Sequence, residues 1–251
     1  RDLRAQNIRY LETSINLFLL EFHVFDLDDF VRTLRREAPA DMDVRIYCGF
    51  RRNAYVGRMA HIIDAAAASD EVEGLDLHGF ETFPLEAWTA EVWARSRAAG
   101  KRNKAHAVEF VGAGSVRQVM DELKVERVQH GVRAVEDPAL VERLAGEGTV
   151  LDLCPISNLR LKVCPSIARH PLRALWDAGV RCTVNSDDPI LFGNYLMDDL
   201  VALVEEGGFT LAEIIALLKV GWEEARIDAA ARAGFIGELD AAAGRLPAGW
   251  A

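Results

Sequence analysis

The stretch Thr183-Val184-Asn185-Ser186-Asp187-Asp188-Pro189 ends a buried apolar run in two adjacent carboxylates, and its proline cannot continue a central strand. Neighbouring side chains at a strand end point in different directions, so Asp187 and Asp188 can serve two different tasks. Two carboxylates are costly to bury unless a metal ion, a proton or hydrogen bonds compensate them. Because aspartate also commonly caps helices, a loop with a capping aspartate is the alternative interpretation.

Similar strand-like runs occur along the whole chain. Each lies between turn residues and is rich in β-branched or apolar side chains, as buried strands are. The predicted strands are residues 8–15, 44–49, 74–77, 104–108, 127–130, 149–154 and 181–185.

The segments between these runs have a helical period. Their apolar residues are spaced i, i+3, i+4 and i+7, which places them on one face of a helix. This spacing is found in Leu27, Phe30, Val31 and Leu34 and again in Val116, Val119, Met120 and Leu123. Asp26 precedes the first of these helices and is placed to cap it. Alternating strands and helices imply a parallel sheet with right-handed crossovers.

Two α/β architectures fit this alternation, a doubly wound open sheet and a closed (β/α)8 TIM-type barrel. No glycine-rich phosphate loop opens a helix, which weakens a nucleotide-binding open sheet. Polar residues recur at the carboxyl ends of the strands, where barrel enzymes carry their active sites. We count seven strand–helix repeats where a (β/α)8 barrel needs eight, and the sequence begins at Arg1 without a methionine. We therefore expect one barrel domain over residues 1–251, with the first strand and its motif absent from this chain.

The composition limits the partners that the protein can have. A formal net charge of −10 argues against a nucleic-acid backbone or an anionic membrane as partner. No apolar run reaches the roughly 20 residues of a membrane span. The four cysteines show no CxxC spacing and are typical of buried thiols in a reducing compartment, so we expect a cytoplasmic protein. The sequence does not determine the oligomeric state.

Chemically capable side chains gather at the predicted strand ends. His106 and Glu109 end the fourth strand, and His130 ends the fifth just before Gly131. Taken alone, the pair His106 and Glu109 fits a structural role better than a functional one, and His78 after the third strand fits a hydrogen-bonded neighbour better than a ligand. His130 alone fits a hydrogen-bonded core histidine and a functional residue equally well. Together with Asp187 and Asp188 they would converge on one face of a barrel. Mixed nitrogen and oxygen ligands suit a zinc-like ion that keeps one position open for water.

These segments, in this order, resemble the adenosine deaminase family of metal-dependent amidohydrolases. The matching stretches are Arg9-Tyr10-Leu11-Glu12, Gly74-Leu75-Asp76-Leu77-His78-Gly79, His106-Ala107-Val108-Glu109, His130-Gly131-Val132-Arg133-Ala134, Cys154-Pro155-Ile156-Ser157-Asn158-Leu159 and Ser186-Asp187-Asp188-Pro189. The similarity covers roughly residues 8–200. Each motif is weak alone, but six in family order are hard to produce by chance.

The resemblance implies hydrolytic deamination of a 6-aminopurine nucleoside or base, with release of ammonia. His106 and Asp187 resemble zinc ligands, and Asp187 would also take a proton from the bound water. Glu109 would protonate the purine at N1, and His130 would hold or deprotonate the attacking water. Asp188 would hydrogen-bond purine N7, and the backbone of Gly79 the N3 edge. One Zn2+ per chain is expected, with two further histidine ligands from the absent first strand.

The sequence departs from the family pattern in three ways. The His-x-His pair that ends the family's first strand occurs nowhere in these 251 residues. Val108 stands where the family usually has glycine, and a β-branched side chain there would narrow the pocket. His78-Gly79-Phe80 replaces small and acidic neighbours near the purine edge. Since family members act on adenosine, adenine and modified purine nucleosides, the last two departures bear on the substrate.

Two alternatives remain. One is a zinc hydrolase that acts on another amine or amide, with Glu109 as a general proton shuttle. The other is a non-catalytic binding protein built on the same barrel. The second alternative is opposed by the joint presence of Glu109, His130, Asp187 and Asp188. If the protein had lost its activity, accumulated mutations would not have kept four polar groups whose burial in a closed pocket costs free energy.

Overall fold

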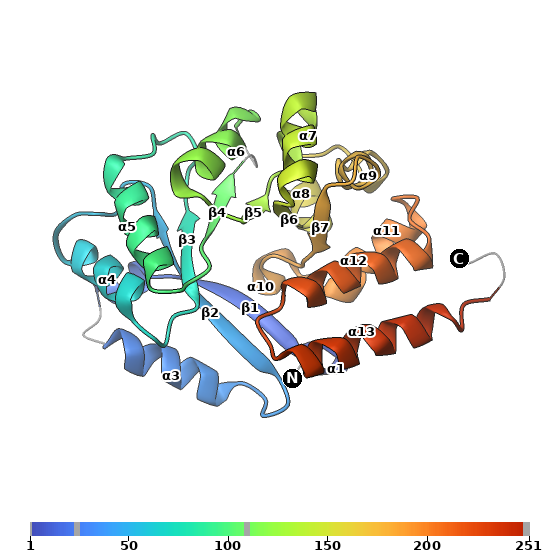
Figure 1. Ribbon diagram of the computed structural model, residues 1–251, viewed down its shortest axis with the longest axis horizontal. Helices are drawn as coiled ribbons and strands as arrows, with labels where there is room; N and C mark the ends of the chain where they lie inside the picture. Colours follow the sequence, from blue (N-terminus) through green and yellow to red (C-terminus); the bar gives the residue numbers. More distant parts are fainter. Residues whose placement is uncertain (1, 23–25, 108–110, 248–251) are drawn as a thin grey trace. The chain divides into compact units, whose positions relative to one another are not determined.

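The computed structural model describes residues 2–22, 26–107 and 111–247 (Figure 1). The chain divides into two compact units, Arg1–Gly131 and Val132–Ala251, which we call unit 1 and unit 2 and describe separately. That residues 1–251 form a single domain remains a prediction.

Unit 1 contains a parallel sheet whose strands follow one another in sequence order. The strands are β1 (Tyr10–Asn16), β2 (Asp43–Arg51), β3 (Gly74–His78), β4 (Lys104–Ala107) and β5 (Arg127–His130). Its register places Gly49 beside Asp76, and Asp76 beside Lys104. All five strands lie within two residues of their predicted bounds, apart from the end of the fourth, where Val108 lies outside the described residues.

Helices follow these strands, and α3, α4 and α5 cover one face of the sheet (Figure 1), while α1 precedes the first strand. They are α1 (Asp2–Ala5), α2 (Phe18–Glu21), α3 (Leu27–Glu37), α4 (Gly57–Ala68), α5 (Ala87–Ala98), α6 (Gly114–Gln118) and the π-helix η1 (Val119–Leu123). The predicted cap is confirmed, since the Asp26 carboxylate accepts a hydrogen bond of 3.0 Å from the Asp29 amide. The second predicted apolar face is also confirmed, because all four of its residues are buried in α6 and η1.

The two faces of the sheet in unit 1 differ in polarity because successive side chains of a strand alternate. The apolar set that includes Phe50, Leu75 and Leu77 is buried, and the fully buried Trp93 of α5 packs edge-on against Phe50 with ring centroids 5.4 Å apart. The alternate positions of β3 and β4 carry Asp76, His78, Lys104 and His106. Helix packing therefore accounts for one face, and the other is available for polar chemistry.

Unit 2 has the same α/β character with two strands. Strand β6 (Val150–Leu153) pairs in parallel with β7 (Arg181–Val184), as the alternation predicts. The helical elements are η2 (Val132–Glu136), α7 (Pro138–Glu147), α8 (Pro155–Arg160), η3 (Ile167–Arg169), α9 (Leu172–Asp177), α10 (Pro189–Phe192), α11 (Leu196–Glu205), α12 (Leu211–Glu224) and α13 (Ala229–Ala243). Helices α9, α11 and α12 contact β7. Of the helices in the described ranges, none has the length and apolar character needed to span a membrane.

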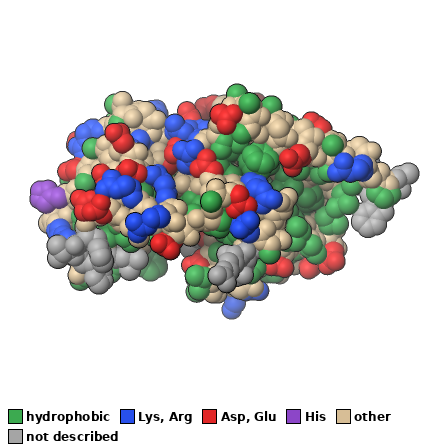
Figure 2. Space-filling model, turned by 90° about the horizontal axis from the view of Figure 1, so that it is seen from below, with side chains coloured by type: hydrophobic (Ala, Val, Ile, Leu, Met, Phe, Trp, Pro, Cys, Tyr) green, Lys and Arg blue, Asp and Glu red, His purple; other side chains and the backbone are tan. Residues whose placement is uncertain are grey.

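Both units confirm the α/β class and the parallel pairing of their strands. The (β/α)8 barrel whose first strand and motif are absent from these 251 residues remains a prediction. On the face shown in Figure 2, basic and acidic side chains are intermixed, with apolar atoms between them.

Candidate active site

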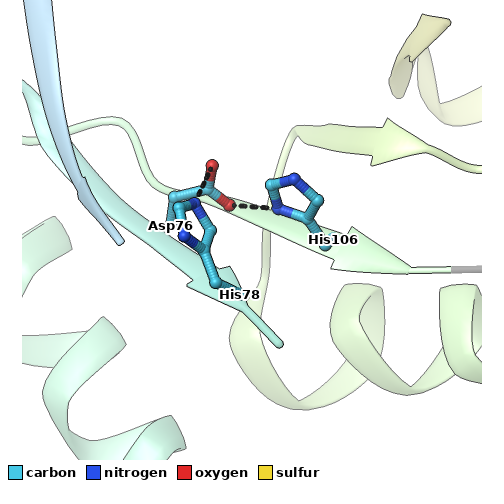
Figure 3. A group of neighbouring side chains, drawn as sticks. All are labelled: Asp76, His78 and His106. Carbon is cyan, nitrogen blue, oxygen red and sulfur yellow. Dashed lines mark hydrogen bonds and ion pairs between the residues drawn. The ribbon is translucent and has the colours of Figure 1, made fainter. Parts of the chain in front are cut away.

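Three polar side chains meet at the carboxyl ends of β3 and β4 in unit 1 (Figure 3). We call Asp76, His78 and His106 the imidazole cluster. The Asp76 carboxylate lies between the two rings, with Oδ1 3.1 Å from His106 Nδ1 and Oδ2 3.3 Å from His78 Nε2. Asp76 is 1% exposed, whereas the His106 side chain is 26% exposed. The cluster thus combines a buried carboxylate with an imidazole that solvent can reach.

The charge of Asp76 determines which ring nitrogens carry hydrogen. Burial raises the pKa of Asp76, but interactions with His106 and His78 outweigh burial and hold it well below its usual range. Since an ionised carboxylate only accepts hydrogen bonds, the two nitrogens that face it must donate. His106 therefore carries its hydrogen on Nδ1. A carboxylate that orients an imidazole through Nδ1 is the arrangement found in carboxylate–histidine–metal sites.

His130 is the last residue of β5, so it lies at the same carboxyl-terminal edge of the sheet as His78 and His106. Its ring centroid lies 5.2 Å from that of His106, and only 3% of the residue is exposed. The backbone of His130 has φ +63°, in the left-handed region that non-glycine residues rarely adopt, and Gly131 follows with φ +66°. Such strain gathers at functional sites because the surrounding structure must hold it in place. The backbone conformation thus supports the functional interpretation of His130.

Gly79 directly follows β3, and its backbone has a conformation that favours glycine. Its φ is +85°, and a β-carbon added there would lie 3.1 Å from Arg51 Cγ. The absence of a side chain leaves the backbone at this strand end open to a close approach. This agrees with the predicted contact of Gly79 through its main chain, which remains a prediction.

In unit 2, Asp187 and Asp188 have different partners, as their adjacent positions predict. Asp187 has φ +60° and accepts a hydrogen bond of 2.6 Å from Ser157 Oγ on α8. Asp188 caps α10, with its Oδ1 3.0 Å from the amides of Ile190 and Leu191. The capping interpretation therefore holds for one oxygen of Asp188, and its predicted contact with purine N7 remains a prediction.

The predicted site residues divide between the two units. His106, His130 and Gly79 belong to unit 1, where the two histidines are neighbours, whereas Asp187 and Asp188 belong to unit 2. Glu109 and Val108 lie outside the described residues. His78, for which the sequence left a ligand and a hydrogen-bonded neighbour as alternatives, is a hydrogen-bonded neighbour of Asp76.

Sequence reasoning gave no separate role to Asp76 or Ser157, which appear only within stretches that match the family. The available signal for Asp76 was its position two residues before His78, which places both side chains on one face of the strand. Its contact with His106 depends on the pairing of β3 with β4, which no local pattern encodes.

Comparisons with known proteins identify similar proteins at the level of family and of individual sequences. Residues 1–242 match the model of the family described as adenosine deaminase. An adenine deaminase of Rhodospirillum rubrum is 38% identical over 172 residues, which are 68% of this chain and 52% of that protein. The chain spans about half the length of the curated relatives it matches.

Solved structures show the same similarity. A crystal structure of adenine deaminase from Arthrobacter aurescens superimposes with a TM-score of 0.86 at 25% identity, over 97% of this chain and 76% of that one. An amidohydrolase from Burkholderia ambifaria with bound zinc gives a TM-score of 0.83 at 26% identity, over 97% and 71%. The family model and the curated relative together show that the chain belongs to the adenosine deaminase family.

Proposed function

We propose that this chain is part of a metal-dependent hydrolase that removes the 6-amino group of a purine and releases ammonia. The observation that carries the proposal is the imidazole cluster, in which the buried Asp76 carboxylate fixes the His106 ring through Nδ1. Membership of the adenosine deaminase family supports the reaction type. Because R. rubrum and A. aurescens relatives are adenine deaminases, we infer a 6-aminopurine substrate with the free base adenine as its first candidate.

The donor chemistry of this chain fits zinc. A neutral imidazole nitrogen and a carboxylate oxygen are both ligands of catalytic zinc, and we assign them to His106 Nε2 and Asp187. Catalytic zinc sites keep three protein ligands as a rule, so these residues account for part of the set. The B. ambifaria relative was solved with zinc. When bound, zinc would supply Lewis acidity and lower the pKa of a water molecule to near neutral.

The remaining residues would handle protons and orient the purine. Glu109 would donate a proton to N1, which makes C6 electrophilic, and His130 would take a proton from the water that attacks C6. Asp188 would accept a hydrogen bond at the N7 edge, and the main chain of Gly79 would contact the N3 edge. Water adds to C6, the C6–N bond breaks, and the amino group leaves as ammonia. The balance is one amine and one water converted into one carbonyl group and one ammonia.

The proposal is tested by measuring ammonia release from adenine, adenosine and AMP by the full-length protein. We expect ammonia from at least one of them, and most from adenine. Ammonia from none of these, in a folded protein loaded with zinc, would contradict the proposal. A different zinc hydrolase or a binding protein would then be the better account.

A matched variant tests the role of Glu109. Glu109→Gln keeps the shape of the side chain but removes the proton donor, so the rate should fall by about 10²–10⁴-fold. The zinc content should not change, because Glu109 is not assigned as a ligand. If Glu109→Gln is as active as the parent, the assigned proton transfer is wrong.

A further inference from the structure

His78 lies in a socket made by three strands. Its Nε2 is 2.7 Å from Ser14 Oγ on β1 and 3.3 Å from Asp76 Oδ2 on β3. On β2, a β-carbon added to Gly49 would lie 2.0 Å from His78 Cε1 and 2.4 Å from both ring nitrogens. The ring therefore occupies the space that any side chain at position 49 would need. Gly49 is required here for a close approach and not for an unusual backbone conformation.

The socket fixes one ring nitrogen toward Asp76. His78 Nε2 lies 3.3 Å from Asp76 Oδ2, and because a carboxylate oxygen accepts hydrogen bonds, this ring nitrogen carries the hydrogen. This Nε2–H lies between Asp76 Oδ2 and Ser14 Oγ, while His106 Nδ1–H occupies Asp76 Oδ1. Both oxygens of the carboxylate are thus engaged, which leaves it without freedom to rotate. A Ser–His–Asp relay is excluded, because such a relay needs opposite ring nitrogens, whereas Ser14 and Asp76 share Nε2.

We propose that His78 is a positioning residue of the candidate metal site: its Nε2–H locks the Asp76 carboxylate, and the locked carboxylate orients the His106 imidazole. The role is indirect, because His78 itself touches neither metal nor purine in this account. The rings of His78 and His106 also pack edge to face, with centroids 4.7 Å apart, so the socket limits tilting of His106 as well. The inference rests on the proposed function in one respect, namely that His106 is a metal ligand.

The direct test uses three variants of the full-length protein that remove the Nε2–H donor of His78, replace it at the same position, or place it at a different position. His78→Ala leaves Asp76 Oδ2 without its imidazole donor, and zinc affinity should fall by roughly 10–100-fold, the range for partners of metal ligands. His78→Gln should restore most of this loss, because a glutamine amide can reach the position of Nε2. His78→Asn should resemble His78→Ala, because the shorter amide reaches only the position of Nδ1. Competition with a chelator measures each affinity.

A second pair of variants tests the socket without changing the imidazole. In Gly49→Ala the three heavy atoms nearest to the new methyl group all belong to the His78 ring, at 2.0–2.4 Å, so the ring must move. Zinc affinity should fall as it does in His78→Ala. The double variant Gly49→Ala/His78→Ala should be no worse than His78→Ala alone, because the space is then empty. Full additivity of the two losses would contradict the socket.

A proton NMR measurement on the metal-free protein separates this inference from the proposed function. The His106 Nδ1–H resonance should be protected in the parent and in His78→Gln, and should exchange faster in His78→Ala. If the parent neither binds zinc nor releases ammonia, the proposed function fails, yet this resonance still reports on the His78–Asp76–His106 chain. Unchanged exchange in a folded His78→Ala, or zinc affinity equal to the parent, would overturn the positioning role. Complete loss of zinc in both His78→Ala and His78→Gln would make His78 a ligand instead.

Discussion

Strand β4 carries two buried polar clusters of unit 1 that differ in how their charges are satisfied. At its first residue, Lys104 contacts Glu12, which also accepts hydrogen bonds of 2.6 Å from Arg127 and 2.7 Å from Tyr10. We call Glu12, Lys104 and Arg127 the ionic cluster. Two residues later, His106 belongs to the imidazole cluster with Asp76 and His78. The two clusters thus share one strand and one face of the sheet.

The difference between the clusters indicates two tasks. In the ionic cluster one carboxylate accepts from three donors, and the side chains of Glu12 and Lys104 are 8% and 7% exposed. The imidazole cluster also satisfies its carboxylate, but its His106 side chain is 26% exposed. In parallel α/β barrels the amino ends of the strands serve stability and the carboxyl ends serve chemistry. We therefore expect changes in the ionic cluster to lower stability and changes in the imidazole cluster to lower activity.

The largest contrast should come from His106→Asn compared with Lys104→Met on the same strand. Asparagine keeps an amide N–H near the position of Nδ1 for Asp76 but removes Nε2, so bound zinc and ammonia release should be lost together. Lys104→Met should destabilise the fold while the molecules that remain folded stay active. Zinc content, ammonia release and thermal unfolding of both variants check this. A folded but inactive Lys104→Met would remove the distinction between the clusters.

Glu12→Gln should give the largest loss of stability. It removes the charged acceptor that Lys104 and Arg127 share, and breaking a buried ion pair in this way costs about 3–5 kcal/mol. The free energy of unfolding is measured with urea, with the exposed Glu37→Gln as control. A loss below about 1 kcal/mol, as for a surface ion pair, would show that the ionic cluster does not support the fold.

Acid should weaken the ionic cluster in a defined pH window. Burial raises the pKa of Glu12, but Lys104 and Arg127 outweigh burial and lower it from 4.5 to about 2. A carboxyl group with a lowered folded pKa stabilises fully above its unfolded pKa and loses this contribution as the pH falls through the folded pKa. Up to about 3 kcal/mol should therefore be lost between pH 4.5 and about 2. Urea unfolding of the parent and Glu12→Gln across this range measures it, and equal pH slopes would contradict it.

The smallest predicted effect is that of Asp76→Asn in the imidazole cluster. The amide offers one acceptor oxygen where the carboxylate offers two, so the His106 ring loses its fixed orientation. Zinc affinity should fall by roughly 10–100-fold without the complete loss expected of His106→Asn. Chelator competition measures this fall. Affinity equal to that of the parent would mean that Asp76 does not orient His106.

Much of the local structure was predictable from the sequence. The β-branched runs between turn residues predict all seven strands, and the spacing before Leu123 predicts a buried helical face. His106, His130, Asp187 and Gly79 stand out because they end strands, where a parallel sheet gathers functional groups. In the described residues the apolar runs between turn residues are distinct enough for the strand predictions to hold.

The contacts that define both clusters could not be predicted in this way. Glu12 meets Lys104 and Arg127 across more than 90 residues of sequence, and Asp76 meets His106 only because β3 pairs with β4. The left-handed backbone at His130 and Asp187 has no local sequence signal, since neither residue is glycine. Asp188 shows the opposite case, because its capping role was visible in the Asp-Pro sequence and the structure confirms it for Oδ1.

The most direct test of the central claim is the metal dependence of ammonia release from adenine by the full-length protein. The protein is stripped with a chelator, dialysed, assayed, and assayed again after addition of zinc in known amounts. We expect activity to vanish with the metal and to return as zinc approaches one ion per chain. Full activity in protein shown to be metal-free would contradict the assignment of His106 and Asp187 as metal ligands.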